Sequence, residues 1–179
     1  MDTKAAPSPE ALIQVANLTK TYNNGAGLIE VLRRVDFEVH LGEMVAVMGP
    51  SGSGKSTLLY ILGLLQAPSS GSYYWEDIDL LSLDRGQQAE FRRRRLGFVW
   101  QACDLLEHSN VYENLEFPLI YEGIEKKERP DRIKEALERV NLGHRLYHNA
   151  NLLSGGERQR VAVARLTKSC AQHDQPVRC

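Results

Sequence analysis

The fold is decided by residues 49–57, which read Gly49-Pro50-Ser51-Gly52-Ser53-Gly54-Lys55-Ser56-Thr57. The stretch matches Gly-x-x-x-x-Gly-Lys-Ser/Thr, the pattern of a phosphate-binding loop. Glycine lets the backbone take positive φ and approach an anion, so that successive N–H groups point at the phosphates. The Lys55 ammonium is expected to reach the β- and γ-phosphates, and the Ser56 hydroxyl to bind Mg²⁺. We expect all nine residues to line a nucleotide site, because the alternative of a Gly/Ser-rich linker does not suit the flanking sequence.

The flanking residues predict a strand before the loop and a helix after it. Residues 43–48, Glu-Met-Val-Ala-Val-Met, are mostly apolar and predict a strand buried on both faces, as in a parallel sheet. After the loop, apolar side chains recur at helical spacing, at Leu58, Ile61, Leu62 and Leu65. A helix that begins at the loop adds its N-terminal dipole to the anion site. Strand, loop and helix together predict binding of a nucleoside triphosphate.

Composition restricts the class of protein. The chain has 179 residues, which is enough for one domain with a sizeable core. Its net charge of −1 favours neither nucleic acid nor an anionic membrane as a partner. We expect no membrane span, because no apolar run approaches the roughly 20 residues that a bilayer requires. Residues 1–10 are polar and predict a flexible N-terminal arm. Three cysteines without metal-ligand spacing fit free thiols in a reducing cytoplasm.

Each of the other segments shows either the alternating apolar pattern of a strand or the apolar spacing of a helix. Strands are predicted over 12–22, 31–40, 72–75 and 96–100, and helices over 88–95, 111–119 and 130–141. The last helix is amphipathic, with Pro130 suited to its first turn and Gly143 to its C-terminal cap.

A second glycine motif, Leu153-Ser154-Gly155-Gly156-Glu157, leads into an apolar stretch. By spacing alone, Ser154 and Glu157 form a capping box at a helix start. Following a phosphate loop, the motif resembles the LSGGQ-type signature of ABC ATPases, with Glu157 where glutamine is usual. Gln101 resembles the Q-loop glutamine of that family and Tyr22 its A-loop aromatic.

The resemblance covers about residues 12–165 and implies a fold and a function. The fold is α/β, a P-loop NTPase of the ABC ATPase type, with an antiparallel β subdomain and a helical subdomain at about 102–152, within a domain of residues 11–165. The function is that of the ATP-binding, ATP-hydrolysing subunit of an ABC transporter, which couples ATP to export or lipoprotein release through a membrane permease. Residues 91–101, 114–121 and 142–145 look most like lipoprotein-releasing and macrolide-export ATPases.

The resemblance also implies site roles. Tyr22 would stack on adenine, Lys55 and Gln101 would act in catalysis, and Ser56 and Gln101 would hold Mg²⁺. Two copies would face head to tail around ATP, each contacting the other's nucleotide through Ser154, Gly155 and Gly156. The helical subdomain would dock the permease, which places the protein in the cytoplasm on the inner face of the cell membrane. A short interval between Lys55 and Ser154 argues against chromosome-maintenance ATPases, and the lack of cysteine clusters argues against repair ATPases.

The chain departs from the family pattern after Arg165. The family places four apolar residues and an Asp-Glu pair beyond the signature, and residues 166–179 contain neither. We hypothesise a truncated or frameshifted product with an atypical tail and an incomplete core sheet. A hydrolysis-deficient nucleotide-binding remnant is therefore the alternative function.

Overall fold

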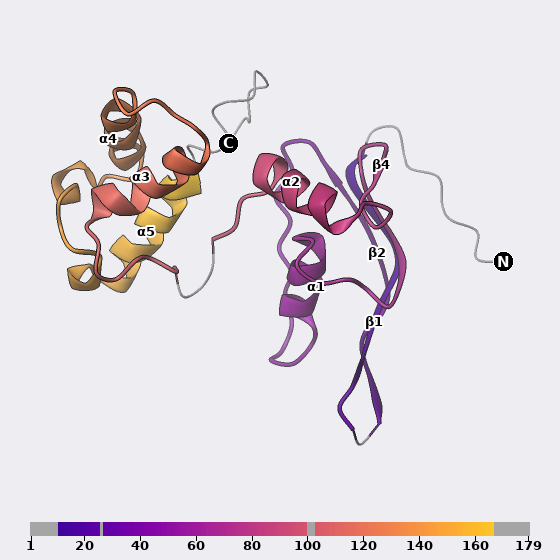
Figure 1. Ribbon diagram of the computed structural model, residues 1–179. Helices are drawn as coiled ribbons and strands as arrows, with labels where there is room; N and C mark the ends of the chain where they lie inside the picture. Colours follow the sequence, from indigo (N-terminus) through magenta and orange to yellow (C-terminus); the bar gives the residue numbers. More distant parts are fainter. Residues whose placement is uncertain (1–10, 26, 100–102, 167–179) are drawn as a thin grey trace. The chain divides into compact units, whose positions relative to one another are not determined.

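The computed structural model describes residues 11–25, 27–99 and 103–166, which fall into two compact units (Figure 1). The first contains the described residues up to Arg93, and the second begins at Arg94. No described helix has the length and apolar character that a membrane crossing requires.

The first unit is built on a four-stranded antiparallel sheet in the order β2-β1-β3-β4. Its strands are β1 (Ala11–Asn23), β2 (Leu28–His40), β3 (Ser70–Trp75) and β4 (Ile78–Asp79). The strands predicted over 12–22, 31–40 and 72–75 are confirmed, and β2 and β3 begin earlier than predicted. The apolar pattern is enough to predict these strands because β1 and β2 form a hairpin and β3 pairs with β1. The three strands therefore satisfy one another's backbone hydrogen bonds.

Strand β3 approaches β1 so closely that one position requires glycine. A Cβ on Gly71 would lie 2.6 Å from both the Asn17 carbonyl oxygen and the Leu18 Cα, and Gly71 has φ of 104°. The β1–β3 register shifts at this point, between Ala16 and Thr19. Leu18 of β1, next to this close approach, is completely buried.

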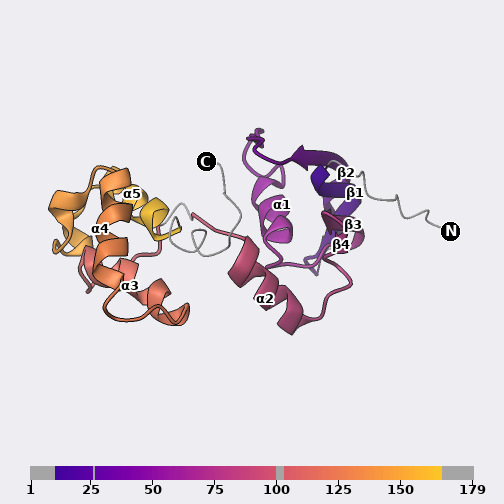
Figure 2. The same cartoon turned by 90° about the horizontal axis from the view of Figure 1, so that it is seen from above.

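Helix α1 (Lys55–Leu62) lies along one face of this sheet (Figures 1 and 2). Leu58 and Ile61 are buried, as predicted, but the helix ends before Leu65, which is 48% exposed. Leu64 takes a left-handed φ of 54° and is buried instead. The Leu64 and Leu65 amides donate back to Ile61 and Tyr60, so a Schellman turn replaces the expected last turn of the stripe.

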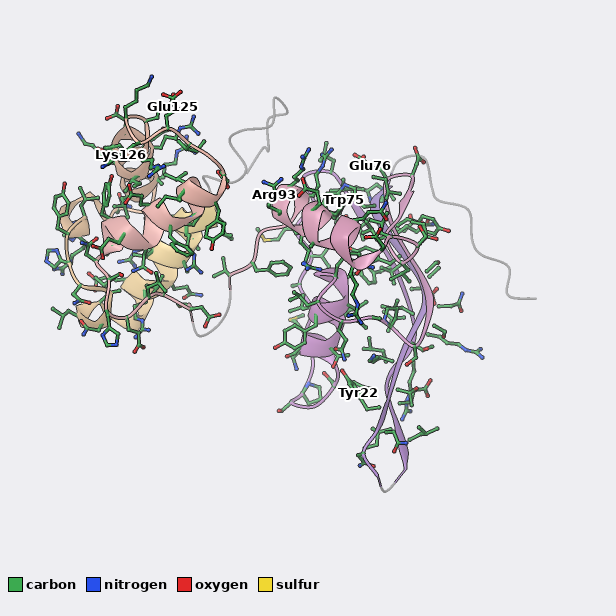
Figure 3. All side chains as sticks on the ribbon, in the orientation of Figure 1. Tyr22, Trp75, Glu76, Arg93, Glu125 and Lys126 are labelled. Carbon is green, nitrogen blue, oxygen red and sulfur yellow. The ribbon has the colours of Figure 1, made fainter. Side chains whose placement is uncertain are left out.

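Helix α2 (Arg85–Arg95) confirms the predicted helix over 88–95 and begins three residues earlier. Asp84 and Gln87 exchange side chain–backbone hydrogen bonds of 2.8 and 2.9 Å at its start, which is a capping-box arrangement. Phe91 meets Trp75 of β3 edge to face, with ring centroids 5.5 Å apart, and Trp75 is labelled in Figure 3. Arg92 donates a hydrogen bond of 2.8 Å to the Leu64 carbonyl, which ties α2 to the end of α1.

Two predicted buried strands are wrong. Residues 43–48 form no strand, and Met44 and Met48 are 96% and 87% exposed. Residues 96–99 are likewise irregular, and Trp100 lies outside the described residues. A strand buried on both faces needs a neighbour on each side to pair its N–H and C=O groups, and the described part of the chain supplies none to these segments.

The second unit is helical, and its helices pack together around one core (Figure 2). Its elements are α3 (Val111–Tyr121), α4 (Arg129–Arg139), the 3₁₀ turns η1 (Gly143–Arg145) and η2 (Ala150–Leu152), and α5 (Gly155–Leu166). The predicted helices over 111–119 and 130–141 are therefore confirmed to within two residues at each end. The core includes Leu115, Ile133, Leu137 and Val161, all with 1% exposure or less.

The end of α4 differs from prediction. Asn141, not Gly143, takes the left-handed conformation, with φ of 57°. The Asn141 amide donates to Glu138 and the Leu142 amide to Leu137, at 3.0 and 2.8 Å, which forms a Schellman motif. Asparagine tolerates this conformation, and Gly143 instead begins η1.

Candidate nucleotide-binding site

The phosphate loop has the backbone that its glycines predict. Gly49, Gly52 and Gly54 have φ of 152°, 80° and 90°, and the Ser53 amide donates to the Pro50 carbonyl at 3.3 Å. Gly54 is the N-cap of α1, and no side chain caps the helix there. Since a helix start has backbone N–H groups without intrahelical partners, this end of α1 offers donors to a ligand.

Lys55 is wrapped by the loop that precedes it. Its ammonium donates to the Gly49 carbonyl at 2.8 Å and to the Pro50 carbonyl at 2.6 Å, and lies 3.5 Å from the Ser53 hydroxyl. The positive charge therefore sits inside the curve of the loop, next to the start of α1.

The last glycine of the loop is packed against β2. A Cβ on Gly54 would lie 2.9 Å from the Val31 carbonyl oxygen and 3.0 Å from a Leu32 methyl carbon. The left-handed φ and this contact both exclude larger side chains. The loop is thus fixed by the sheet at the point where α1 begins.

The residues present fit a nucleoside triphosphate with a metal ion. The first turn of α1 carries no acidic residue, so nothing there repels an anion. The Ser56 side chain belongs to an exposed residue in that turn and offers a hydroxyl oxygen, the hard type of ligand that Mg²⁺ prefers. Within the described ranges no three His, Cys, Asp or Glu side chains could together hold a metal ion.

Tyr22 is held in place by Gln66 and Lys20, whose roles no local sequence pattern predicts. Its hydroxyl donates to the Gln66 amide oxygen at 2.9 Å, and the Gln66 amide nitrogen lies 2.7 Å from the same hydroxyl. The Lys20 ammonium lies 5.2 Å from the ring centroid and donates to the Ala67 carbonyl at 2.6 Å. Tyr22 is labelled in Figure 3, and 37% of the residue is exposed. Its stacking on adenine stays a prediction.

The signature motif forms the start of α5, and the predicted capping box is confirmed. The Ser154 backbone N–H and hydroxyl both donate to Glu157 Oε2, at 2.9 and 2.7 Å. The Glu157 amide donates back to the Ser154 hydroxyl at 3.3 Å. Gly155 and Gly156 are exposed, so their backbones are open to a ligand.

Arg145 completes this turn and was not predicted from the sequence. Its Nε donates to Glu157 Oε1 at 3.0 Å, from the end of η1. The hydrogen bonds from Ser154, and then the Arg145 charge, lower the pKa of the Glu157 carboxyl from 4.5 to about 2. Glu157 is therefore ionised at neutral pH. Arg145 and Glu157 are twelve residues apart in the sequence, so no local pattern predicts their contact.

The predicted site residues fall in different parts of the molecule. Tyr22 and the phosphate loop belong to the first unit, whereas Ser154, Gly155 and Gly156 belong to the second. Gln101 lies outside the described residues. The nucleotide-binding and catalytic roles of all these residues stay predictions.

This combination of phosphate loop, antiparallel sheet and helical unit defines a class of nucleotide-binding transport protein. The chain belongs to the ABC transporter family, whose profile matches residues 32–172. Its fold is that of ABC-type P-loop ATPases, because the dimeric ATP-binding cassette MJ0796, solved in a post-hydrolysis state with ADP and Pi, superposes with a TM-score of 0.79. That match has 39% identity and covers 88% of this chain and 69% of MJ0796.

Two curated relatives show how the chain relates to longer proteins. YknY of Bacillus subtilis, an uncharacterized ABC transporter ATP-binding protein, is 47% identical over 154 residues, which are 86% of this chain and 67% of YknY. The macrolide export ATP-binding/permease protein MacB of Marinobacter nauticus is 44% identical over 158 residues, which are 88% of this chain and 24% of MacB. The chain thus spans about two thirds of the first and a quarter of the second.

Proposed function

We propose that this chain is the ATP-binding and ATP-hydrolysing part of an ABC transporter that drives export, or release of a lipoprotein, through a membrane permease. The observation that carries the proposal is the phosphate loop, which has three glycines at positive φ, leads into an uncapped helix start, and binds the Lys55 ammonium through the Gly49 and Pro50 carbonyls. The relatives named for ATP binding and macrolide export support it.

ATP would bind along the phosphate loop of the first unit. The backbone N–H groups of the loop, which Pro50 lacks, and the Lys55 ammonium would hold the phosphates, and Tyr22 would stack on adenine. Mg²⁺, held by Ser56 and Gln101, would supply charge neutralisation on the β- and γ-phosphates. Hydrolysis depends mainly on positioning and charge stabilisation, which Lys55 and Gln101 would contribute.

A second copy would complete the nucleotide site. Ser154, Gly155 and Gly156 stand at the amino end of α5, where the helix dipole favours an anion. In a head-to-tail dimer they would contact the γ-phosphate held by the other copy's loop. The dimeric structure of MJ0796 supports this arrangement.

The helical unit would bind the permease at the inner face of the cell membrane. Helix α3 exposes apolar and aromatic side chains, of which Phe117 and Tyr121 are 48% and 72% exposed and meet edge to face at 5.0 Å. Exposed aromatic residues are enriched at protein interfaces. MacB, which joins ATP-binding and permease parts in one chain by name, supports such a pairing.

The test is nucleotide binding by the full chain. We expect Lys55→Ala to weaken binding of a fluorescent ATP analogue by about 10- to 100-fold, because one charge-assisted contact is lost. Lys134→Ala, which removes an exposed lysine from α4, is the matched control and should leave affinity unchanged. Equal affinity of wild type and Lys55→Ala would refute a phosphate role for the loop.

A phosphate-release assay on the same samples separates the two functions that the sequence left open. Release that depends on Lys55 identifies an ATPase. Binding without release identifies the hydrolysis-deficient alternative.

A further inference from the structure

The signature turn poses an electrostatic problem for the function proposed above. The hydroxyl and N–H of Ser154, which a phosphate would approach, both donate to the Glu157 carboxylate. Glu157 carries a full negative charge at neutral pH, since its pKa lies at about 2. An ionised carboxylate at this position repels a second anion and competes for the same donors.

Arg145 compensates the charge of Glu157, because among the described residues it is the cation that contacts this carboxylate. The Arg145 and Glu157 side chains are 36% and 16% exposed, so water screens the pair only partly. The neighbouring arginine on α5, Arg158, faces Glu107 at 3.3 Å instead.

The backbone holds Arg145 in place. The Arg145 amide donates to the Leu142 carbonyl at 2.9 Å, and Leu142 is fully buried at the end of α4. The next residue, Leu146, accepts a hydrogen bond of 2.9 Å from the Tyr112 amide of α3. The turn that carries Arg145 is thus fixed by hydrogen bonds to α3 and to the residues that follow α4, and its guanidinium contacts α5.

The contacts divide the two carboxylate oxygens of Glu157. Arg145 takes Oε1, and Ser154 takes Oε2 with both its N–H and its hydroxyl. If the Ser154 hydroxyl rotates to donate to a phosphate, Oε2 keeps the Ser154 N–H and Oε1 keeps the guanidinium. One proton then changes its acceptor, and the capping box otherwise stays intact.

We propose that Arg145 is a positioning residue that neutralises the charge of Glu157. Ser154 and Gly156 can then donate hydrogen bonds to the γ-phosphate held by a second copy of this chain. The inference rests on the proposed head-to-tail dimer and names the charge balance that makes it possible. Without Arg145, the carboxylate loses the guanidinium that contacts it, and it repels the incoming phosphate more strongly.

The experiment measures self-association of the full chain in MgATP by sedimentation velocity, with MgADP as the reference nucleotide. We expect Arg145→Ala to weaken MgATP-dependent association by about 5- to 30-fold, the range for one partly screened charge. Arg145→Lys keeps the charge and should retain most of the association. Arg139→Ala, which removes an exposed arginine paired with Glu135 on α4, is the matched control and should have no effect.

The decisive variant is Arg145→Ala combined with Glu157→Gln. Glutamine removes the charge that needs compensation, so the double variant should regain most of the association lost by Arg145→Ala. A loss that Glu157→Gln does not rescue, with helical content by circular dichroism reduced, would assign Arg145 a purely structural role and overturn the inference.

The remaining outcomes separate this inference from the proposed function. Wild-type association that Arg145→Ala leaves unchanged overturns the role of Arg145 and leaves the dimer standing. ATP binding without MgATP-dependent association of wild type overturns the dimer, and the inference with it.

Discussion

The phosphate loop and the signature turn are both glycine-containing helix starts, but they satisfy their backbone donors in opposite ways. At the phosphate loop, Gly54 caps α1 without any side-chain hydrogen bond and without an acidic residue in the first turn. At the signature turn, Ser154 and Glu157 cap α5 reciprocally, and Arg145 adds a countercharge. The first leaves donors for a ligand, whereas the second has already given some of them to its own carboxylate.

The difference implies a division of labour. A loop with uncapped amides and an enclosed lysine suits tight binding of phosphates by one copy. A capped turn must exchange a hydrogen bond when phosphate arrives, so it suits a contact that forms only when a second copy brings the phosphate. Affinity would then reside mainly in the first unit, and the response to ATP in the second.

The largest effect should come from the core that supports the signature turn. Leu137→Ala removes a fully buried side chain from the helical unit, which should cost about 2–5 kcal/mol of unfolding free energy. Urea unfolding followed by circular dichroism measures the loss, and the exposed neighbour change Glu138→Ala is the control. ATP affinity at a temperature where the variant stays folded should not change, and a matching loss would contradict separate roles for the two units.

A smaller effect should come from the close approach of the phosphate loop to β2. Gly54→Ala and Gly52→Ala both place a side chain at positive φ, but only the alanine at 54 meets a backbone oxygen at 2.9 Å, whereas nothing lies within 4 Å of the one at 52. We expect Gly54→Ala to lose about 1–3 kcal/mol more stability than Gly52→Ala. Equal urea midpoints would show that the strand does not fix the loop.

The smallest effect should come from the titration of Glu157. Because the pKa of this carboxyl falls from 4.5 to about 2 on folding, its ionised form stabilises the fold above pH 4.5, and that contribution is lost as pH falls toward 2. Melting temperatures of wild type should exceed those of Glu157→Gln near neutral pH and converge with them near pH 2. A difference that persists unchanged to pH 2 would contradict the capping role of the carboxylate.

Local patterns allowed much of this architecture to be predicted. The phosphate loop, the capping box of Ser154 and the amphipathic helix α4 each depend on residues within one or two turns, so the sequence contains the necessary information. The family resemblance is confirmed by the family match over residues 32–172, and the fold that it implies is confirmed by the likeness to the MJ0796 structure.

The errors arise where structure depends on distant partners. Residues 43–48 have the composition of a buried strand, but a strand exists only with neighbours to pair it. Asn141 takes the left-handed position at the end of α4 where Gly143 was the expected residue, and the leucine that follows it, Leu142, is fully buried. Gln66 and Arg145 act through contacts 44 and 12 residues away, which no local pattern reveals.

The buried side chain of Asn114 joins an irregular segment of the chain to α3. Its amide, on a residue only 1% exposed, accepts from the Leu106 N–H at 2.7 Å and donates to the carbonyls of Leu106 and Asn110 at 3.2 and 3.0 Å. The irregular segment 103–106 is therefore clamped to α3, and Arg165 of α5 also holds it through the Asp104 carbonyl at 3.0 Å. Because hydrogen bonds join this segment to both α3 and α5, it should move together with these helices as one body.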